Sequence, residues 1–123
     1  MSGLTRCRAD KDGIVGDMTV EYYAQRASAG LIISEGINIS STALGTYLTP
    51  GLFNKAQIDA WKKVTNAVHQ RGSFIYAQLW HTGRVGHSVD RNGILPVAPS
   101  AVAIKDRNIT LHLEKWILKY LMP

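Results

Sequence analysis

Two short apolar runs stand out in the pattern of hydrophobic and polar positions. The first, "LIISEG" at residues 31–36, contains β-branched residues and predicts a buried strand. The second, "SFIYAQL" at residues 73–79, predicts another strand. Both runs are too short for a helix of ordinary length.

Helical patterns precede each run. Asp17 is the expected N-cap of a first helix, Met18, Tyr22 and Ala29 give it a partial apolar stripe, and Gly30 is suited to the position after its end. In the second helix, Asn54 followed by Gln57 resembles a capping box, and Gly72 marks the end. The apolar positions of the second helix at helical spacing are Ile58, Trp61, Val64 and Val68.

The alternation of strands and helices predicts an α/β fold with a parallel sheet and right-handed crossovers. In such sheets ligands bind beyond the carboxyl ends of the strands. That edge would carry Gly36 and residues 78–84. Periodicity does not separate a (β/α)₈ barrel from a doubly wound sheet. Because a barrel needs about 200 residues or more, the barrel interpretation means a partial TIM barrel that contains only its N-terminal βα units.

The remaining segments are less regular. Residues 37–53 are rich in Ser, Thr, Gly and Pro and predict a long loop, which in ordered proteins tends to carry function. Residues 85–110 predict an extended segment without a clear helix. The tail at 111–123 is either a helix that covers a sheet edge or a segment without settled structure. Its apolar positions at helical spacing are Leu113, Trp116, Ile117 and Leu121.

Composition excludes several classes. The chain has 123 residues, 46% of them hydrophobic, and a net charge of +5. Its basic residues are scattered and not interleaved with aromatic ones, so we expect no nucleic-acid partner. No apolar run approaches the roughly 20 residues that span a bilayer, and no signal peptide is present. With Cys7 as the single cysteine and no zinc spacing, we expect no metal site and a cytoplasmic location.

Several candidate binding residues lie near the expected carboxyl ends of the strands. Gln78 offers two donors and an acceptor to a planar heterocycle, although residue type alone favours a glutamine bonded to nearby backbone. Trp80 either walls a pocket or belongs to the core. For His81, Arg84 and His87, surface or structural roles are favoured over an anion or metal site.

Two further candidates lie in other segments. The Thr5 hydroxyl, close to the N-terminus, can bond a ligand carbonyl, with a turn or capping role as the default. Tyr47 either reaches a pocket from the long loop or is an exposed loop aromatic. Neither residue carries a strong signal alone. Phosphate-binding glycine motifs and a nucleophile elbow do not occur.

Taken together, the motifs resemble the old yellow enzyme family of flavin-dependent ene-reductases and NADPH dehydrogenases. They occur in the family's order and spacing and cover about residues 4–105. The matching stretches are "LTRCRA" (4–9), "VEYYAQRASAGLIISEG" (20–36), "TPGLF" (49–53), "AWKKVTNAVHQRG" (60–72), "QLWHTGR" (78–84) and "LPVAPSA" (95–101). The resemblance implies a TIM barrel that binds FMN at the carboxyl ends of its strands.

The resemblance also implies a reaction and residue roles. NADPH reduces the FMN, and the flavin passes hydride to the activated C=C bond of an α,β-unsaturated carbonyl compound. Thr5 resembles the threonine that bonds the flavin ring, Gly36 the small residue beside it, and Gln78 the glutamine that bonds its pyrimidine part. Trp80 and Tyr47 resemble residues of the substrate pocket. No catalytic residue is assigned, because the family's substrate-binding pair and tyrosine proton donor have no counterpart here.

These implications lead to two expected parts of the chain. Residues 1–110 would be the N-terminal portion of an FMN-binding barrel, and residues 111–123 a divergent tail. We expect a truncated chain that is weak or inactive alone, with an enone-type substrate in the complete enzyme. The alternative is an inactive barrel fragment that serves as an interaction or regulatory remnant and self-associates through exposed barrel edges. A small flavodoxin-like module is the third interpretation.

Overall fold

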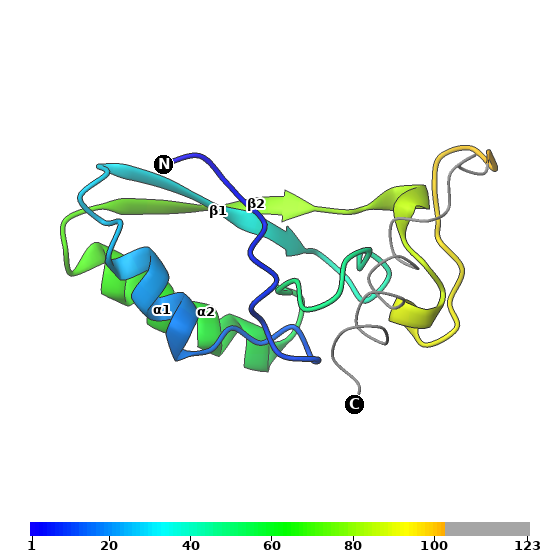
Figure 1. Ribbon diagram of the computed structural model, residues 1–123, viewed down its shortest axis with the longest axis horizontal. Coiled ribbons are helices and arrows are strands. Elements are labelled where there is room, and N and C mark those ends of the chain that lie inside the picture. The colour runs from blue at the N-terminus through cyan, green and yellow to red at the C-terminus, as the bar shows by residue number, and fades with distance from the viewer. Residues whose placement is uncertain (103–123) are drawn as a thin grey trace, which may run out of the picture.

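The computed structural model describes residues 1–102. Its elements follow the order α1 (Asp17–Ala24), β1 (Leu31–Asn38), α2 (Lys55–His69) and β2 (Phe74–Trp80). Two 3₁₀ turns, Gly83–Val85 and Val89–Arg91, follow β2. The two strands lie on one side of the molecule and both helices on the other (Figure 1). The expected alternation of helix and strand is therefore confirmed.

The sheet is parallel, as the sequence predicts. Leu31 lies opposite Phe74 and Ile33 opposite Tyr76, but Gly36 lies opposite Gln78, so β1 has one extra residue between these pairs. This β-bulge puts Ile33 and Gly36 on the same face of the sheet, although they are three positions apart. On the other edge of β1, the Met1 ammonium donates to Leu31 O at 2.7 Å, and Ile33 N–H donates to Met1 O at 2.9 Å.

Helix α2 begins as predicted. The Asn54 side chain accepts a hydrogen bond from Gln57 N–H at 2.9 Å, which satisfies one of the free donors of the first turn. The reciprocal half of a capping box does not form. Gln57 is instead buried, and it accepts from Phe53 N–H and donates to Asp12 O. Its side chain thus joins the start of α2 to the loop before α1.

Helix α1 differs from the prediction in three ways. Gly16, and not Asp17, is its N-cap residue, and the helix ends at Ala24 instead of reaching Gly30. The expected stripe is only partly confirmed, since Tyr22 packs against the core but Met18 is exposed, and the buried positions are Thr19, Tyr23 and Ala24. The reason is that this short helix has a weak apolar pattern, so packing against α2 and β1 selects the buried face.

The core lies between the sheet and the helices. Ile32 and Ile37 of β1 are 0% and 1% exposed, and they pack with Trp61 and Val64 of α2. The Trp61 indole N–H donates to Gly51 O at 3.2 Å, so the largest core side chain also has its polar atom satisfied. Three of the four predicted apolar positions of α2 are buried, and the fourth, Ile58, is exposed.

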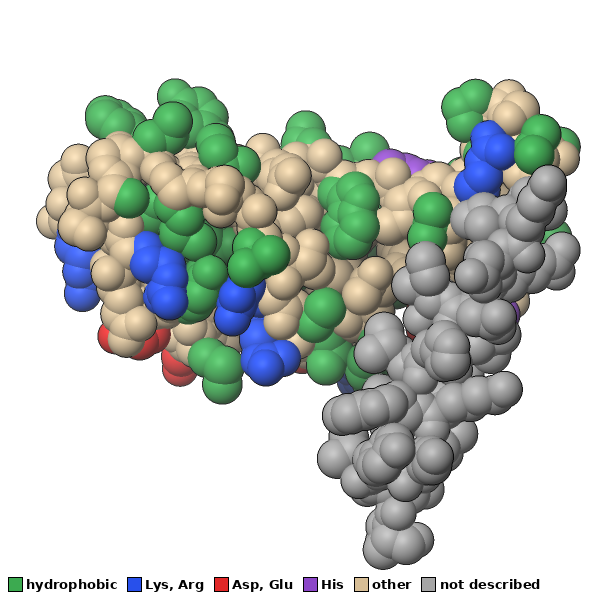
Figure 2. All heavy atoms as spheres, turned by 45° about the horizontal axis from the view of Figure 1, so that its top comes forward, with side chains coloured by type: hydrophobic (Ala, Val, Ile, Leu, Met, Phe, Trp, Pro, Cys, Tyr) green, Lys and Arg blue, Asp and Glu red, His purple; other side chains and the backbone are tan. Residues whose placement is uncertain are grey.

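The other face of the sheet is open. Phe74 and Tyr76 of β2 are 64% and 62% exposed. Figure 2 shows hydrophobic side chains, in green, along the upper border of the molecule, where the sheet lies. β2 also lacks a second neighbouring strand within residues 1–102, because the sheet described there contains only β1 and β2. The structure in this range is therefore one segment of an α/β layer with an uncovered apolar face.

The ends of both strands lie slightly beyond the predicted ones, at Asn38 and Trp80. The extended segment expected at 85–110 contains the 3₁₀ turn Val89–Arg91 in its described part. The tail at 111–123 and the proposed boundary at 110 lie outside the described residues, and both stay predictions. No helix within residues 1–102 is long and apolar enough to cross a membrane.

Candidate functional site

The carboxyl end of the sheet brings two predicted site residues into register. Gly36 of β1 lies directly opposite Gln78 of β2. The bulge before Gly36 interrupts the ladder, and the Ser34 hydroxyl compensates by accepting Gln78 N–H at 3.0 Å and donating to Glu35 O at 2.7 Å. Both Gly36 and Gln78 therefore hold a fixed place at the edge where ligands of parallel sheets bind.

The amide side chain of Gln78 lies against the N-terminal segment. A Cβ atom added at Gly3 would come within 2.5 Å of Gln78 Oε1 and 2.6 Å of Ser34 O, so only a glycine permits this close approach. Thr5 follows two residues later and is exposed. Within residues 1–102, neither the Thr5 hydroxyl nor the Gln78 side-chain amide makes a hydrogen bond. Both polar groups remain available to a ligand.

Trp80 lies over Gly36. A Cβ atom at Gly36 would come within 2.5 Å of Trp80 Cε3 and 2.9 Å of Cδ2. The absence of a side chain at Gly36 therefore lets the indole pack onto β1. Trp80 is half-buried, so part of the ring stays accessible at the carboxyl edge. A flavin contact at Gly36 stays a prediction, since the indole occupies the space beside it.

The loop that carries Tyr47 is attached to the segment after β2. Thr82 donates to Ala43 O through its backbone N–H at 3.2 Å and its hydroxyl at 2.8 Å. Gly45 faces the same threonine at a distance that excludes a Cβ atom. The Tyr47 side chain itself is 49% exposed. The structure thus holds the loop beside the edge of the site without burying the tyrosine.

Below the edge of the sheet, β1 carries a buried carboxylate. Glu35 is 2% exposed, and its Oε2 accepts Arg6 N–H at 3.1 Å. Its backbone N–H donates to the buried Tyr23 hydroxyl at 2.7 Å. Burial raises the pKa of the Glu35 carboxyl, and the bond from Arg6 N–H opposes that shift. Burial also raises the pKa of Tyr23.

His81, His87 and Arg84 make structural hydrogen bonds within the segment after β2, as residue type favoured. His81 Nδ1 accepts from Gly83 N–H at 2.9 Å, and His87 Nδ1 accepts from Val89 N–H at 3.2 Å. Arg84 donates to Val102 O and Ser100 Oγ. Among the described residues, no group of three or more His, Cys, Asp or Glu side chains is placed to hold a metal ion.

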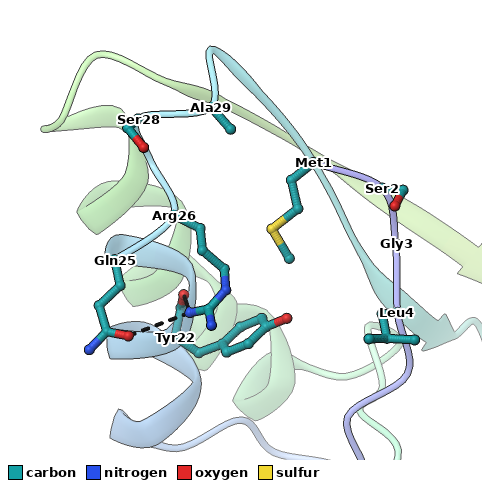
Figure 3. A pocket seen from close by; sticks show the side chains of 9 residues that line it. All are labelled: Met1, Ser2, Gly3, Leu4, Tyr22, Gln25, Arg26, Ser28 and Ala29. Atoms are coloured by element: carbon teal, nitrogen blue, oxygen red, sulfur yellow. Dashed lines mark hydrogen bonds between the residues drawn. The ribbon is translucent and has the colours of Figure 1, made fainter.

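A cavity lies elsewhere in the described part of the chain. It has a volume of about 500 Å³ and opens between the N-terminal segment and the end of α1 (Figure 3). None of the predicted site residues lines it, but Gly3, which lies against Gln78, is one of its lining residues. The lining residues are Met1, Ser2, Gly3, Leu4, Tyr22, Gln25, Arg26, Ser28 and Ala29.

The donor set at the carboxyl edge fits the ring of the flavin that the sequence resemblance implies. An exposed amide and an exposed hydroxyl, both without protein partners among residues 1–102, suit the polar edge of a planar heterocycle. Sequence reasoning did not identify Gly3, Ser34 or Glu35. The signal for the last two was the polar pair inside an otherwise apolar strand, which a simple strand pattern does not explain.

Comparisons with known proteins agree with this arrangement. The chain is 44% identical over 109 residues to 12-oxophytodienoate reductase 7 of Oryza sativa subsp. japonica, covering 87% of this chain and 27% of that protein. It is 48% identical over 108 residues to the flavin oxidoreductase hxnT of Emericella nidulans, covering 84% and 28%. The chain thus spans little more than a quarter of the length of these curated relatives.

Solved structures support the fold. The old yellow enzyme homologue NCR from Zymomonas mobilis superposes with a TM-score of 0.80 at 52% identity, covering 83% of this chain and 28% of that one. Morphinone reductase in complex with tetrahydroNAD gives a TM-score of 0.79, also at 52% identity, with the same coverage. The fold is therefore part of the old yellow enzyme TIM barrel, and the doubly wound alternative is excluded.

The family model for NADH:flavin oxidoreductases and NADH oxidases matches residues 1–122. Enzymes of this family use FMN with NADH or NADPH as the reductant. With its parallel strands, its open carboxyl edge and this match along nearly all its length, the chain belongs to the NADH:flavin oxidoreductase / NADH oxidase family.

Proposed function

We propose that this chain supplies the part of an FMN-dependent ene-reductase that recognises the flavin ring. In the complete reaction NADPH reduces FMN, and the activated C=C bond of an α,β-unsaturated carbonyl compound is then reduced. More than two thirds of each relative's length lies outside the match, since the chain covers 27% and 28% of the first two. Turnover is therefore proposed for a protein of the relatives' length, and ring recognition for these residues.

One observation carries the proposal. The Gln78 amide lies at the carboxyl edge of the sheet, held against Gly3 and opposite Gly36, with no protein partner in the described residues. An exposed amide without a protein partner can bond a ligand without first breaking a hydrogen bond within the protein. The nearby Thr5 hydroxyl is the second free polar group.

The proposed roles follow from these placements. Gln78 would donate to and accept from the pyrimidine part of the ring, and Thr5 would bond a ring carbonyl. Trp80, half-buried over Gly36, would form a wall of the substrate pocket, and Tyr47 would reach the pocket from its loop. When bound, FMN would supply the hydride chemistry, while the chain would orient the ring.

A flavin titration tests the proposal. Fluorescence quenching of riboflavin and of FMN should report binding to the purified 123-residue chain, with similar affinities for both. The reason is that the proposed contacts address the ring and not the phosphate. Gln78→Leu should weaken binding about 10-fold, as expected when a donor and an acceptor are lost together.

His81→Ala is the matched control. His81 follows the same strand, but its Nδ1 bonds a local backbone N–H, so it should leave flavin affinity unchanged. The proposal fails if the chain binds neither flavin, or if Gln78→Leu and His81→Ala weaken binding equally. NADPH oxidation with an enone, measured on the same preparation, would show whether the residues also support turnover.

A second candidate function rests on the open face of the sheet. Leu31, Phe74 and Tyr76 are exposed there, and β2 has no outer neighbour within residues 1–102. Contiguous apolar surface and an unpaired strand edge favour association, so we propose self-association through this face. Sedimentation of the parent chain should reveal concentration-dependent oligomers. A monomer at all concentrations would exclude this candidate.

A further inference from the structure

A buried carboxylate lies behind the proposed flavin site. Glu35 is 2% exposed, and a buried acid is unfavourable unless its oxygens are hydrogen-bonded. Glu35 accepts a hydrogen bond from the backbone N–H of Arg6 at 3.1 Å, and Arg6 lies 29 residues earlier in the chain. Since Arg6 directly follows Thr5, this bond fixes the backbone beside a proposed flavin contact.

The β-bulge explains how Glu35 reaches that segment. In a regular strand, Ile33 and Glu35 would share a face, and Gly36 would take the opposite one. The extra residue in β1 places Gly36 with Gln78, on the face of Ile33 and Tyr76. Glu35 is therefore free to turn toward Arg6, and its own backbone N–H is bonded by Tyr23 from the core. Bulges recur beside active sites because they redirect side chains in this way.

The segment itself needs an anchor. Cys7 has φ +53°, a left-handed conformation that is unfavourable for a residue with a side chain and persists only where neighbouring contacts hold it. At its start, Met1 is hydrogen-bonded along β1. On its other side, the Arg6 guanidinium lies 4.8 Å from the centre of the Tyr22 ring. Of the two contacts that Arg6 makes, the bond to Glu35 is the one that holds its backbone, directly after Thr5.

We infer that Glu35 is a positioning residue for the flavin site: its carboxylate holds the Arg6 backbone, so that the Thr5 hydroxyl faces the ring. The inference rests on the proposed function for the role of Thr5, whereas the Glu35–Arg6 anchor stands on geometry alone. Glu35 does not touch the flavin and acts through Thr5. A side chain that accepts the same bond without a charge should serve the same purpose.

Amide hydrogen exchange tests the anchor without any ligand. Glu35→Leu, which removes the acceptor, should abolish the protection of Arg6 N–H, while Glu35→Gln should keep it. The Ile33 amide is the internal control, since it is bonded to Met1 O on the same strand and not to Glu35. If Glu35→Leu does not fold, Glu35→Asp is the second variant, because it keeps the charge but draws the oxygens back by one methylene. Unchanged Arg6 protection, or equal loss at Arg6 and Ile33, would overturn the anchor.

Riboflavin affinity tests the positioning role through a double-mutant cycle. Thr5→Ala and Glu35→Leu should each raise the dissociation constant about 2- to 10-fold, as loss of one hydrogen bond does. In the Thr5→Ala background, Glu35→Leu should add nothing, and Glu35→Gln should restore parental affinity when Thr5 is present. If the two substitutions together raise the dissociation constant by the product of their separate effects, Glu35 does not act through Thr5, and the inference is overturned. Absence of all flavin binding, with the exchange result intact, would instead contradict the proposed function and leave the anchor supported.

Discussion

The two faces of the β1–β2 sheet differ in their exposure to solvent. On one face, Ile32 and Ile37 are completely covered by the helices, while on the other Phe74 and Tyr76 are more than half exposed. Both sets of residues are apolar. The difference shows that hydrophobic character identifies a strand but does not reveal which neighbour covers it. In the TIM barrel of this family, the helices lie outside the sheet, so the open face would point toward the interior of the barrel.

The comparison also separates stability from function. The covered face contains the core contacts with Trp61 and Val64, and no proposed site residue lies in it. The open face carries Gly36 and Gln78 at its carboxyl end, in register. Substitutions on the two faces should therefore affect different measurements.

The largest expected change in stability is at Ile32, and the adjacent Leu31 on the opposite face is its control. Ile32→Ala removes a fully buried side chain and should lower the free energy of unfolding by about 2–5 kcal/mol, because it leaves a cavity in the core. Leu31→Ala, one position earlier on the opposite face, should lower it by less than about 1 kcal/mol. Urea unfolding followed by circular dichroism gives both values. Equal losses would mean that the open face is covered in solution.

The helix that covers the closed face depends on its cap. Asn54→Ala removes the bond to Gln57 N–H and should lower the free energy of unfolding by about 1 kcal/mol. Asn54→Ser keeps a capping oxygen and is the matched control, with a smaller loss expected. Thermal unfolding of the two variants makes the comparison. A larger loss for Ser than for Ala would contradict the assigned cap.

Glu35 should make stability depend on pH. Burial raises its pKa above the ordinary value of 4.5, so the folded chain holds the proton to higher pH than the unfolded chain does. Its contribution to stability is therefore fully present below pH 4.5 and is lost as the pH rises through the raised folded value. Glu35→Gln should remove this loss, so its stability should fall less between pH 4.5 and neutrality. Parallel pH profiles of parent and variant, from urea unfolding, would contradict the assignment.

The smallest effect on stability is expected on the open face. Tyr76→Ser should change the free energy of unfolding by no more than about 0.5 kcal/mol, because the side chain is 62% exposed. The same substitution should reduce self-association in sedimentation experiments, since it removes apolar surface from the proposed contact. An unchanged oligomer distribution would mean that the chain does not associate through this face.

The sequence predicted the elements better than the details of the site. Strong periodicity identified α2 and its cap, and the apolar runs identified both strands. The predicted apolar stripe of α1 was only partly right, because the helix is short and the elements that pack against it determine which side is buried. The bulge and the Glu35–Arg6 bond were not predicted, since each depends on residues about 30 to 40 positions apart that only the fold brings together. Motif resemblance located Thr5 and Gln78, whose roles remain proposals.

The most direct test of the central claim is the riboflavin titration of the parent chain and of Gln78→Leu. We expect saturable binding, similar affinities for riboflavin and FMN, and a dissociation constant about 10-fold higher in the variant. No binding by the folded parent chain, or equal affinity of parent and variant, would contradict the claim that the carboxyl edge of this sheet recognises a flavin ring.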